Sequence, residues 1–145
     1  MRHSDNILCS NWRFEVDTYI GCSIIIKDND NKLLIAQRSK SKKKFSLLWE
    51  TVGGALEDNE TPEECIRREV REEINCSIQD LKIFKVYIIN QDNRYVLIVY
   101  TGKINEQIQY NLEIEQIRWI DKSEIQKLNF CCNESEKLID YYSCN

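Results

Sequence analysis

Histidine, proline and glycine are scarce in this chain of 145 residues, which contains one histidine, one proline and four glycines. The single histidine, His3, excludes a Ser-His-Asp triad and a multi-histidine metal site within one chain. Chemistry must therefore depend on carboxylates, lysines, tyrosines or thiols. Because glycine and proline are so few, each one marks a position where the backbone has a special requirement.

Long apolar runs and a surplus of basic residues are also missing. Apolar stretches such as YVLIVY (95–100) are far shorter than the roughly 20 residues of a membrane-spanning helix, so we expect no membrane partner. The net charge of −4 argues against nucleic acid as a partner. Residues 1–17 contain no apolar signal-peptide core, which favours a cytoplasmic protein. The length fits one domain over residues 1–145.

Cysteine is the exception to this scarcity, with seven residues in the chain. The number is odd, no CxxC occurs, and the spacings match no zinc-binding pattern. We therefore expect buried or idle thiols in a reducing compartment. A labile redox role for the adjacent Cys131 and Cys132 is the alternative.

Apolar and turn patterns predict an α+β fold with a mixed or antiparallel sheet. DNDN (28–31) and QDN (91–93) predict hairpin turns. Segment 104–111 is predicted as a loop or an edge strand. Strands are expected at 20–28, 32–38, the end of 45–52, 81–90, 94–102 and 113–121, and helices at 61–74, 122–128 and 133–143.

The helix at 61–74 carries the strongest signals. Thr61 and Glu64 are spaced as a capping box, and Pro62 suits the first helical position. A four-residue apolar repeat, Ile66, Val70 and Ile74, predicts the buried stripe. Asn75 is expected to end the helix in the left-handed conformation.

Three carboxylates, Glu69, Glu72 and Glu73, lie on one side of this helix, beside its buried stripe. Like charges at such spacings repel by roughly 0.2–0.5 kcal/mol per pair. Helical geometry places Arg67, Arg68 and Arg71 away from them. A solvated face with ion pairs is one explanation. A divalent cation such as Mg²⁺ or Mn²⁺, which prefers oxygen ligands, is the other.

The segment before the helix supports a metal site. Gly53 and Gly54 end an expected strand, so that the backbone can bend and expose a carbonyl, and ALEDNE (55–60) supplies three further acids. A cation held by few carboxylates keeps places for phosphate oxygens. With a glutamate to take a proton from water, this arrangement suits hydrolysis of a phosphoanhydride.

These residues resemble a known signature. Gly54, five residues, Glu60, seven residues and then REVREEINC (68–76) is similar to the Nudix box. All charged positions of the box are present, whereas Asn75 and Cys76 replace its usual glycine and aliphatic residue. A buried cysteine acts as a small hydrophobic residue, so both departures are mild.

The resemblance implies a Nudix-type α/β/α sandwich around a mixed sheet, with the likeness covering about residues 18–130 and the termini outside it. It implies Mg²⁺-dependent cleavage of a nucleoside diphosphate linked to another group, and it allows a homodimer. Glu69, Glu72 and Glu73 match the catalytic, metal-binding glutamates, Glu69 also being a candidate base. Gly53 matches a carbonyl ligand of the metal, and Arg68 with Glu60 matches a structural ion pair.

Candidate substrate contacts lie outside the box. Arg38 and the lysines that follow it can attract phosphates, and Tyr95 can stack on a base. The family often recruits a later glutamate, for which Glu113 and Glu115 are the candidates. For each of these residues the alternative is an ordinary structural role, on the surface for the charged residues or in the core for the aromatic one. Phe45, Trp49 and Tyr87 are further stacking candidates, and for at least two of the four aromatic residues core packing is favoured.

We expect a small nucleotide-type substrate, with a nucleoside triphosphate as the first hypothesis and nucleotide-pool sanitising as its role. A nucleotide sugar, a dinucleoside polyphosphate, nucleotide binding without hydrolysis, and an acidic protein-interaction helix without metal are the alternatives. Isopentenyl-diphosphate isomerases share a similar run at 33–56, but they use histidine ligands that this chain lacks.

Overall fold

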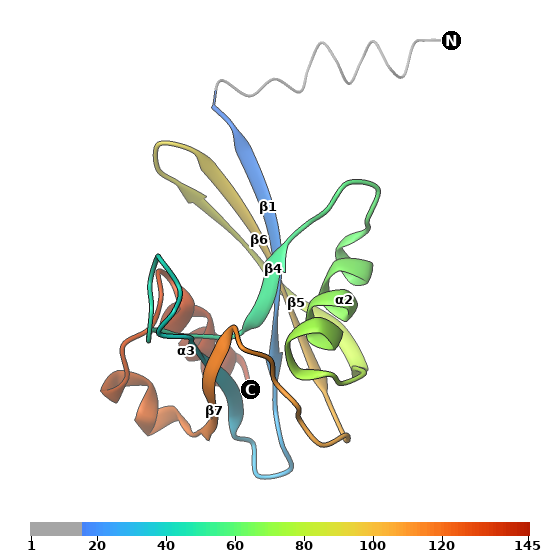
Figure 1. The fold of residues 1–145 in the computed structure, drawn as a ribbon, viewed down its shortest axis with the longest axis vertical. Coiled ribbons are helices and arrows are strands. Elements are labelled where there is room, and N and C mark those ends of the chain that lie inside the picture. The colour runs from blue at the N-terminus through green and yellow to red at the C-terminus, as the bar shows by residue number, and fades with distance from the viewer. Residues whose placement is uncertain (1–15) are drawn as a thin grey trace.

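The computed structural model describes residues 16–145, which form two β-sheets with a helix on either side (Figure 1). The α+β sandwich predicted from the sequence is confirmed. The strands are β1 (Thr18–Ile26), β2 (Leu33–Arg38), β3 (Trp49–Glu50), β4 (Val52–Ala55), β5 (Gln79–Asn90), β6 (Arg94–Lys103) and β7 (Ile114–Ile120). The helices are α2 (Pro62–Ile74), the 3₁₀ helix η1 (Lys122–Lys127) and α3 (Glu134–Cys144).

The larger sheet has the strand order β4-β1-β6-β5 and is mixed, because β1 runs parallel to β6 while the other pairs are antiparallel. The smaller sheet, β3-β2-β7, is antiparallel. β4 is an edge strand, so the Gly53-Gly54 backbone lies at the border of the larger sheet.

The predicted turn at 28–31 is present, but the hairpin it implied is not continued. Asp28 Oδ1 accepts hydrogen bonds from the Asp30 and Lys32 N–H groups at 2.9 and 2.8 Å. After one bridge between Lys27 and Leu33, β1 and β2 enter different sheets. Both edges of β1 are already paired, with β4 and with β6, so no edge is left for β2. Segment 104–111 contains no strand and is a loop.

Helix α2 has the predicted ends and the predicted buried stripe. Thr61 and Glu64 form the capping box, with bonds of 3.2 and 2.9 Å. Asn75 ends the helix at φ 56° and ψ 41°, in the left-handed region. Ile66, Val70 and Ile74 are fully buried against the larger sheet, as is Cys76 after the helix.

Helix α3 covers the opposite side, where Leu138 and Tyr141 pack into a second core with Trp49. The chain before α3 is anchored on β3. The Trp49 N–H donates to the Asn129 carbonyl at 2.9 Å, and the Cys131 N–H donates to the Trp49 carbonyl at 2.8 Å. This pairing brings the start of α3 beside the β3–β4 segment.

Within the described residues, no helix is both long and apolar enough to cross a membrane. The six cysteines among them are free thiols, of which Cys132 and Cys144 are exposed. His3 and Cys9, which entered the sequence predictions, lie outside the described residues.

Candidate active site

The carboxylates of Glu69 and Glu73 face each other one helical turn apart, next to the glycines of β4. Glu73 is held from the strand, because the Gly53 N–H donates to its Oε2 at 3.3 Å. Burial raises the pKa of Glu73 to about 9, and the hydrogen bond and charge of Glu69 add to the effect. Two carboxyl groups lie close together where little water reaches them, so their ionised forms repel each other and a proton or a cation stabilises the pair.

Gly54 leaves room for the Glu69 carboxylate and Gly53 leaves room for strand β1, which differs from the role expected for them. We predicted a bend after the strand, but Gly53 and Gly54 lie inside β4 and neither has a positive φ. A Cβ on Gly54 would lie 2.4 Å from Glu69 Oε1, and a Cβ on Gly53 would lie 2.2 Å from the Cys22 carbonyl oxygen. Close approach, rather than turn geometry, therefore requires glycine here.

Arg68 contacts the acids, and the prediction that it points away from all three carboxylates was wrong. Its Nε donates to Glu60 Oε1 at 2.6 Å, which is the expected structural ion pair, and it lowers the pKa of Glu60 to about 2. Its Nη1 also contacts Glu69 at 2.8 Å and Glu72 at 3.2 Å. The guanidinium can span these positions because its five donors spread over a planar fork.

The residues predicted to bind a metal do not form a ready-made cluster. Among residues 16–145, no three His, Cys, Asp or Glu side chains lie close enough together to hold a metal ion. The Glu72 side chain is 56% exposed and forms an ion pair with Arg68. The Glu69 side chain is only 14% exposed, and Glu73 is largely buried. The donor set still fits a hard divalent cation, because it consists of carboxylate oxygens whose mutual repulsion is relieved only in part.

A cavity of about 270 Å³ opens on the other side of β4, beside the same glycines. Glu50 connects it with the carboxylate pair, because it lines the cavity and its charge also raises the pKa of Glu73. Burial raises the pKa of Glu50 itself, Glu134 adds to this, and Arg38 opposes it. Other polar side chains in the lining are Ser23, Thr51, Glu134 and Lys137.

Lys137 and Glu134 were missed by sequence reasoning. Lys137 is only 1% exposed, and its ammonium pairs with Glu134 one turn earlier in α3. A signal was available: positions 134, 137, 138 and 141 form one helical stripe, whose last two members are the buried Leu138 and Tyr141. Two charged residues on an otherwise apolar stripe indicate a polar contact inside the fold.

None of the three candidate substrate-binding residues lines this cavity, and the structure does not bring them together. Arg38 pairs with Glu50 at 3.3 Å and donates to the Lys44 carbonyl, so it stabilises the loop after β2. Glu115 accepts a bond from the Lys40 N–H at 3.2 Å, which joins β7 to that same loop. Tyr95 stacks on Tyr19 with ring centroids 5.5 Å apart.

Other sequence candidates have ordinary structural partners. Glu113 pairs with Lys42 at 3.0 Å. Trp49 is buried and Tyr87 packs against the same core, as was favoured for at least two of the aromatic residues. Phe45 is 51% exposed at a positive φ of 56°.

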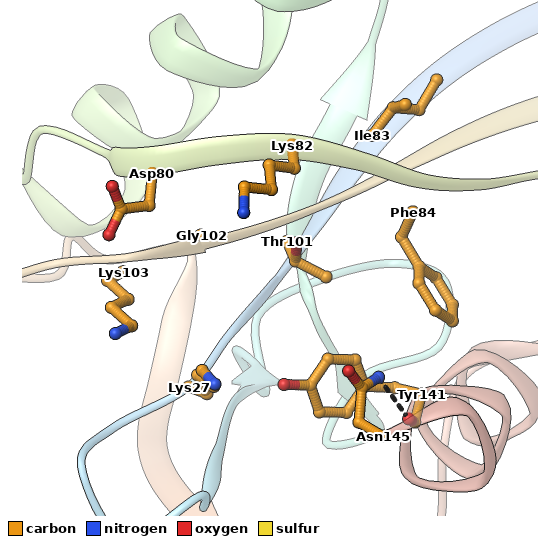
Figure 2. Close-up of a pocket in the computed structure, with 10 residues that line it drawn as sticks. All are labelled: Lys27, Asp80, Lys82, Ile83, Phe84, Thr101, Gly102, Lys103, Tyr141 and Asn145. Atoms are coloured by element: carbon orange, nitrogen blue, oxygen red, sulfur yellow. Dashed lines mark hydrogen bonds between the residues drawn. The ribbon is translucent and has the colours of Figure 1, made fainter.

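A separate cavity of about 360 Å³ lies between the β5–β6 pair and the C-terminal end of α3 (Figure 2). Lys27, Lys82 and Lys103 line this cavity together with the buried ring of Tyr141. None of the Nudix-box acids lines it. It is therefore distinct from the site at β4.

Curated proteins similar to the chain include a prenyl-diphosphate phosphatase and an 8-oxo-dGTP diphosphatase. A prenyl-diphosphate phosphatase of Methanosarcina mazei is 29% identical over 110 residues, which cover 72% of this chain and 64% of that protein. An 8-oxo-dGTP diphosphatase of Proteus vulgaris is 34% identical over 76 residues, which cover 52% of this chain and 67% of that protein. The chain thus spans about two thirds of the length of these relatives.

A solved structure and a family model are also similar to this chain. The crystal structure of the MutT protein from Methanosarcina mazei Go1 superposes with a TM-score of 0.73 at 18% identity, covering 90% of this chain and 96% of that one. This likeness concerns the fold alone. The NUDIX domain family model matches residues 18–141, so the match runs past residue 130 into α3. The chain therefore belongs to the Nudix family.

Proposed function

We propose that this chain is a metal-dependent pyrophosphohydrolase that cleaves a phosphoanhydride bond of a nucleoside triphosphate or a related nucleoside diphosphate derivative. The observation that carries the proposal is the largely buried Glu69–Glu73 pair beside the Gly53-Gly54 strand. A helix surface evolved only for solubility has no reason to bury two facing carboxylates, since their repulsion raises the free energy of the fold.

Glu69 and Glu73, joined by Glu72 and the Gly53 carbonyl, are the residues that would hold Mg²⁺ or Mn²⁺. Such an ion neutralises phosphate charge and orients the anhydride. For Glu72 to join, its 3.2 Å contact with Arg68 must give way. Glu69 is the candidate base that accepts a proton from the attacking water, while Arg68 keeps the 55–60 loop on the helix through Glu60.

The substrate proposal is supported by the cavity beside β4 and by the relatives. A cavity of about 270 Å³ is large enough for a heterocyclic base. The phosphates of such a substrate would extend from it along the β4 edge toward Glu73. The 8-oxo-dGTP diphosphatase similarity favours a nucleotide, and with it a role in nucleotide-pool sanitising. A cytoplasmic location and a homodimer belong to the same proposal.

The test is a hydrolysis screen over nucleoside triphosphates, 8-oxo-dGTP, nucleotide sugars and dinucleoside polyphosphates, each with Mg²⁺ and with Mn²⁺. Glu69→Gln and Glu73→Gln should each lower kcat by at least about 100-fold, on the order of a lost general base. Glu63→Gln is the matched control, because Glu63 lies on the same helix but pairs with Arg67 on the exposed side. Full turnover in both site variants refutes the proposal.

A prenyl diphosphate is the second candidate substrate, because the prenyl-diphosphate phosphatase matches 72% of this chain. Both candidates share the diphosphate and the proposed metal chemistry, and they differ in the group attached to it. The lining of the cavity beside β4 can therefore discriminate between them.

A further inference from the structure

Lys137 is a charged side chain enclosed by the protein. Its Nζ donates to Ser23 Oγ at 2.7 Å and pairs with the Glu134 carboxylate. An ammonium group has three N–H donors, and described residues use two of them. The third remains for whatever occupies the cavity that Lys137 lines.

Glu134 is fixed as firmly as its partner. Its Oε1 accepts hydrogen bonds from the Thr51 N–H at 2.7 Å and from the Thr51 hydroxyl at 3.0 Å, while its Oε2 contacts Lys137. The pair therefore joins α3 to β1 through Ser23 and to the β3–β4 segment through Thr51. Burying an ion pair costs desolvation energy, and apolar residues often do as well for stability alone.

The cavity places this ion pair close to the candidate metal site. Its lining runs from Lys137 and Glu134 past Glu50 to Gly53 and Gly54. The Gly53 N–H in turn binds Glu73. A substrate whose phosphates contact Glu73 would therefore place its attached group against the ion pair.

We propose that Lys137 is a specificity-determining residue that donates its third N–H to a ring nitrogen or carbonyl oxygen of a nucleobase. An isoprenoid chain in the same place would leave the third ammonium proton of Lys137 without water or a partner, which costs free energy. The cavity thus selects a heterocycle that carries an acceptor atom. This inference rests on the proposed function and chooses between its two substrate classes.

The stacked tyrosines agree with this assignment. Residues two apart in a strand face the same side, so Tyr95 lies on the side of Leu97, and Tyr19 on the side of Gly21. Leu97 and Gly21 both line the cavity. The Tyr19–Tyr95 pair, 49% and 40% exposed, therefore borders the cavity with aromatic surface on which a base or ribose can pack.

The experiment is calorimetric titration with Mg²⁺ and non-hydrolysable probes. α,β-Methylene-GTP and α,β-methylene-ATP carry a base, and methylenediphosphonate does not. Lys137→Met keeps a four-atom stem in the side chain and removes the ammonium donor, while Lys127→Met removes an exposed lysine of η1 as the control. Loss of a charged hydrogen bond predicts weaker binding of at least one nucleotide probe by about 10- to 100-fold. Binding of methylenediphosphonate should change less than about twofold.

Equal weakening of both kinds of probe, or no change in either nucleotide, overturns the inference. Because Lys137→Met leaves Glu134 without its partner, the double variant E134Q/K137M is measured as well: the amide introduced at position 134 can still accept from Thr51. The same loss of nucleotide binding in this folded variant supports a direct contact. Wild-type protein that binds no nucleotide probe also overturns the inference.

Different results would refute the proposed function and the role of Lys137. Base-dependent binding with no hydrolysis of any substrate in the screen would refute the pyrophosphohydrolase and leave the role of Lys137 standing. Conversely, if dimethylallyl diphosphate is hydrolysed with a lower KM than every nucleotide, the hydrolase stands and the role of Lys137 is refuted.

Discussion

Glu73→Gln should stabilise the metal-free protein, because Glu73 is held against Glu69 in a largely buried position. Its folded-state pKa is raised above the ordinary glutamate value of 4.5 to about 9. A group of this kind stabilises the fold below its unfolded pKa, and that stability is lost as pH rises through the folded pKa. The free energy of unfolding of the wild type should therefore fall between about pH 4.5 and pH 9.

The magnitude follows from the same values. One pKa unit corresponds to about 1.4 kcal/mol, so at pH 7 the upper limit of the loss is about 3.5 kcal/mol. Sharing of the proton with Glu69 reduces it, and we expect about 1–3 kcal/mol. Glutamine carries no charge and its carbonyl can still accept from the Gly53 N–H, so the variant should lose this pH dependence.

The assay is urea unfolding of wild type, Glu73→Gln and the control Glu63→Gln at pH 5, 7 and 8.5, in EDTA and in excess Mg²⁺. Mg²⁺ should raise the stability of the wild type at pH 8.5 and leave that of Glu73→Gln unchanged. Equal stability of wild type and Glu73→Gln at pH 8.5 in EDTA would refute the argument that the carboxylates repel each other.

Three further predictions concern the surroundings of the site. Gly54→Ala places a methyl group 2.4 Å from Glu69 Oε1. Displacement of that carboxylate should lower kcat/KM by about 100-fold in a steady-state assay. A change under twofold would contradict the argument that position 54 has no room for a side chain. Arg68→Gln removes contacts to Glu60 and Glu69 of 2.6 and 2.8 Å, so limited proteolysis should cut the 55–60 loop faster than in Arg67→Gln. Asn75→Ala should lower the free energy of unfolding by about 1 kcal/mol, because alanine is strained in the left-handed region, whereas Asn75→Gly should stay within about 0.5 kcal/mol of wild type. Urea unfolding measures both. Equal losses in the two variants would show that the side-chain hydrogen bond to Gln109, at 3.1 Å, matters more than the backbone conformation.

Local signals in the sequence were sufficient to predict α2 in detail. The capping box, the four-residue apolar stripe and the left-handed Asn75 depend on contacts within a few residues, which the spacing of residue types specifies directly. The strands were predicted by the same means, because alternation and turn residues are local. The Arg68–Glu60 pair followed from the resemblance of 54–76 to the Nudix box, and the structure contains it.

The tertiary structure decided how distant segments meet. No local pattern shows that β1 pairs in parallel with β6, since that register depends on strands more than 60 residues apart competing for the same edges. Nor does a local pattern distinguish a glycine needed for a bend from one needed for space, which depends on the Glu69 side chain opposite Gly54.

The composition and spacing of residues alone thus determined a small α+β chain and indicated the glutamates of one helix as its candidate site. Only the folded protein shows that Arg68 contacts Glu69, and that Lys137 and Glu134 of α3 line the cavity beside β4. The reason is physical: helix caps and stripes depend on neighbours along the chain, whereas a cavity and its buried charges depend on packing between segments far apart in sequence.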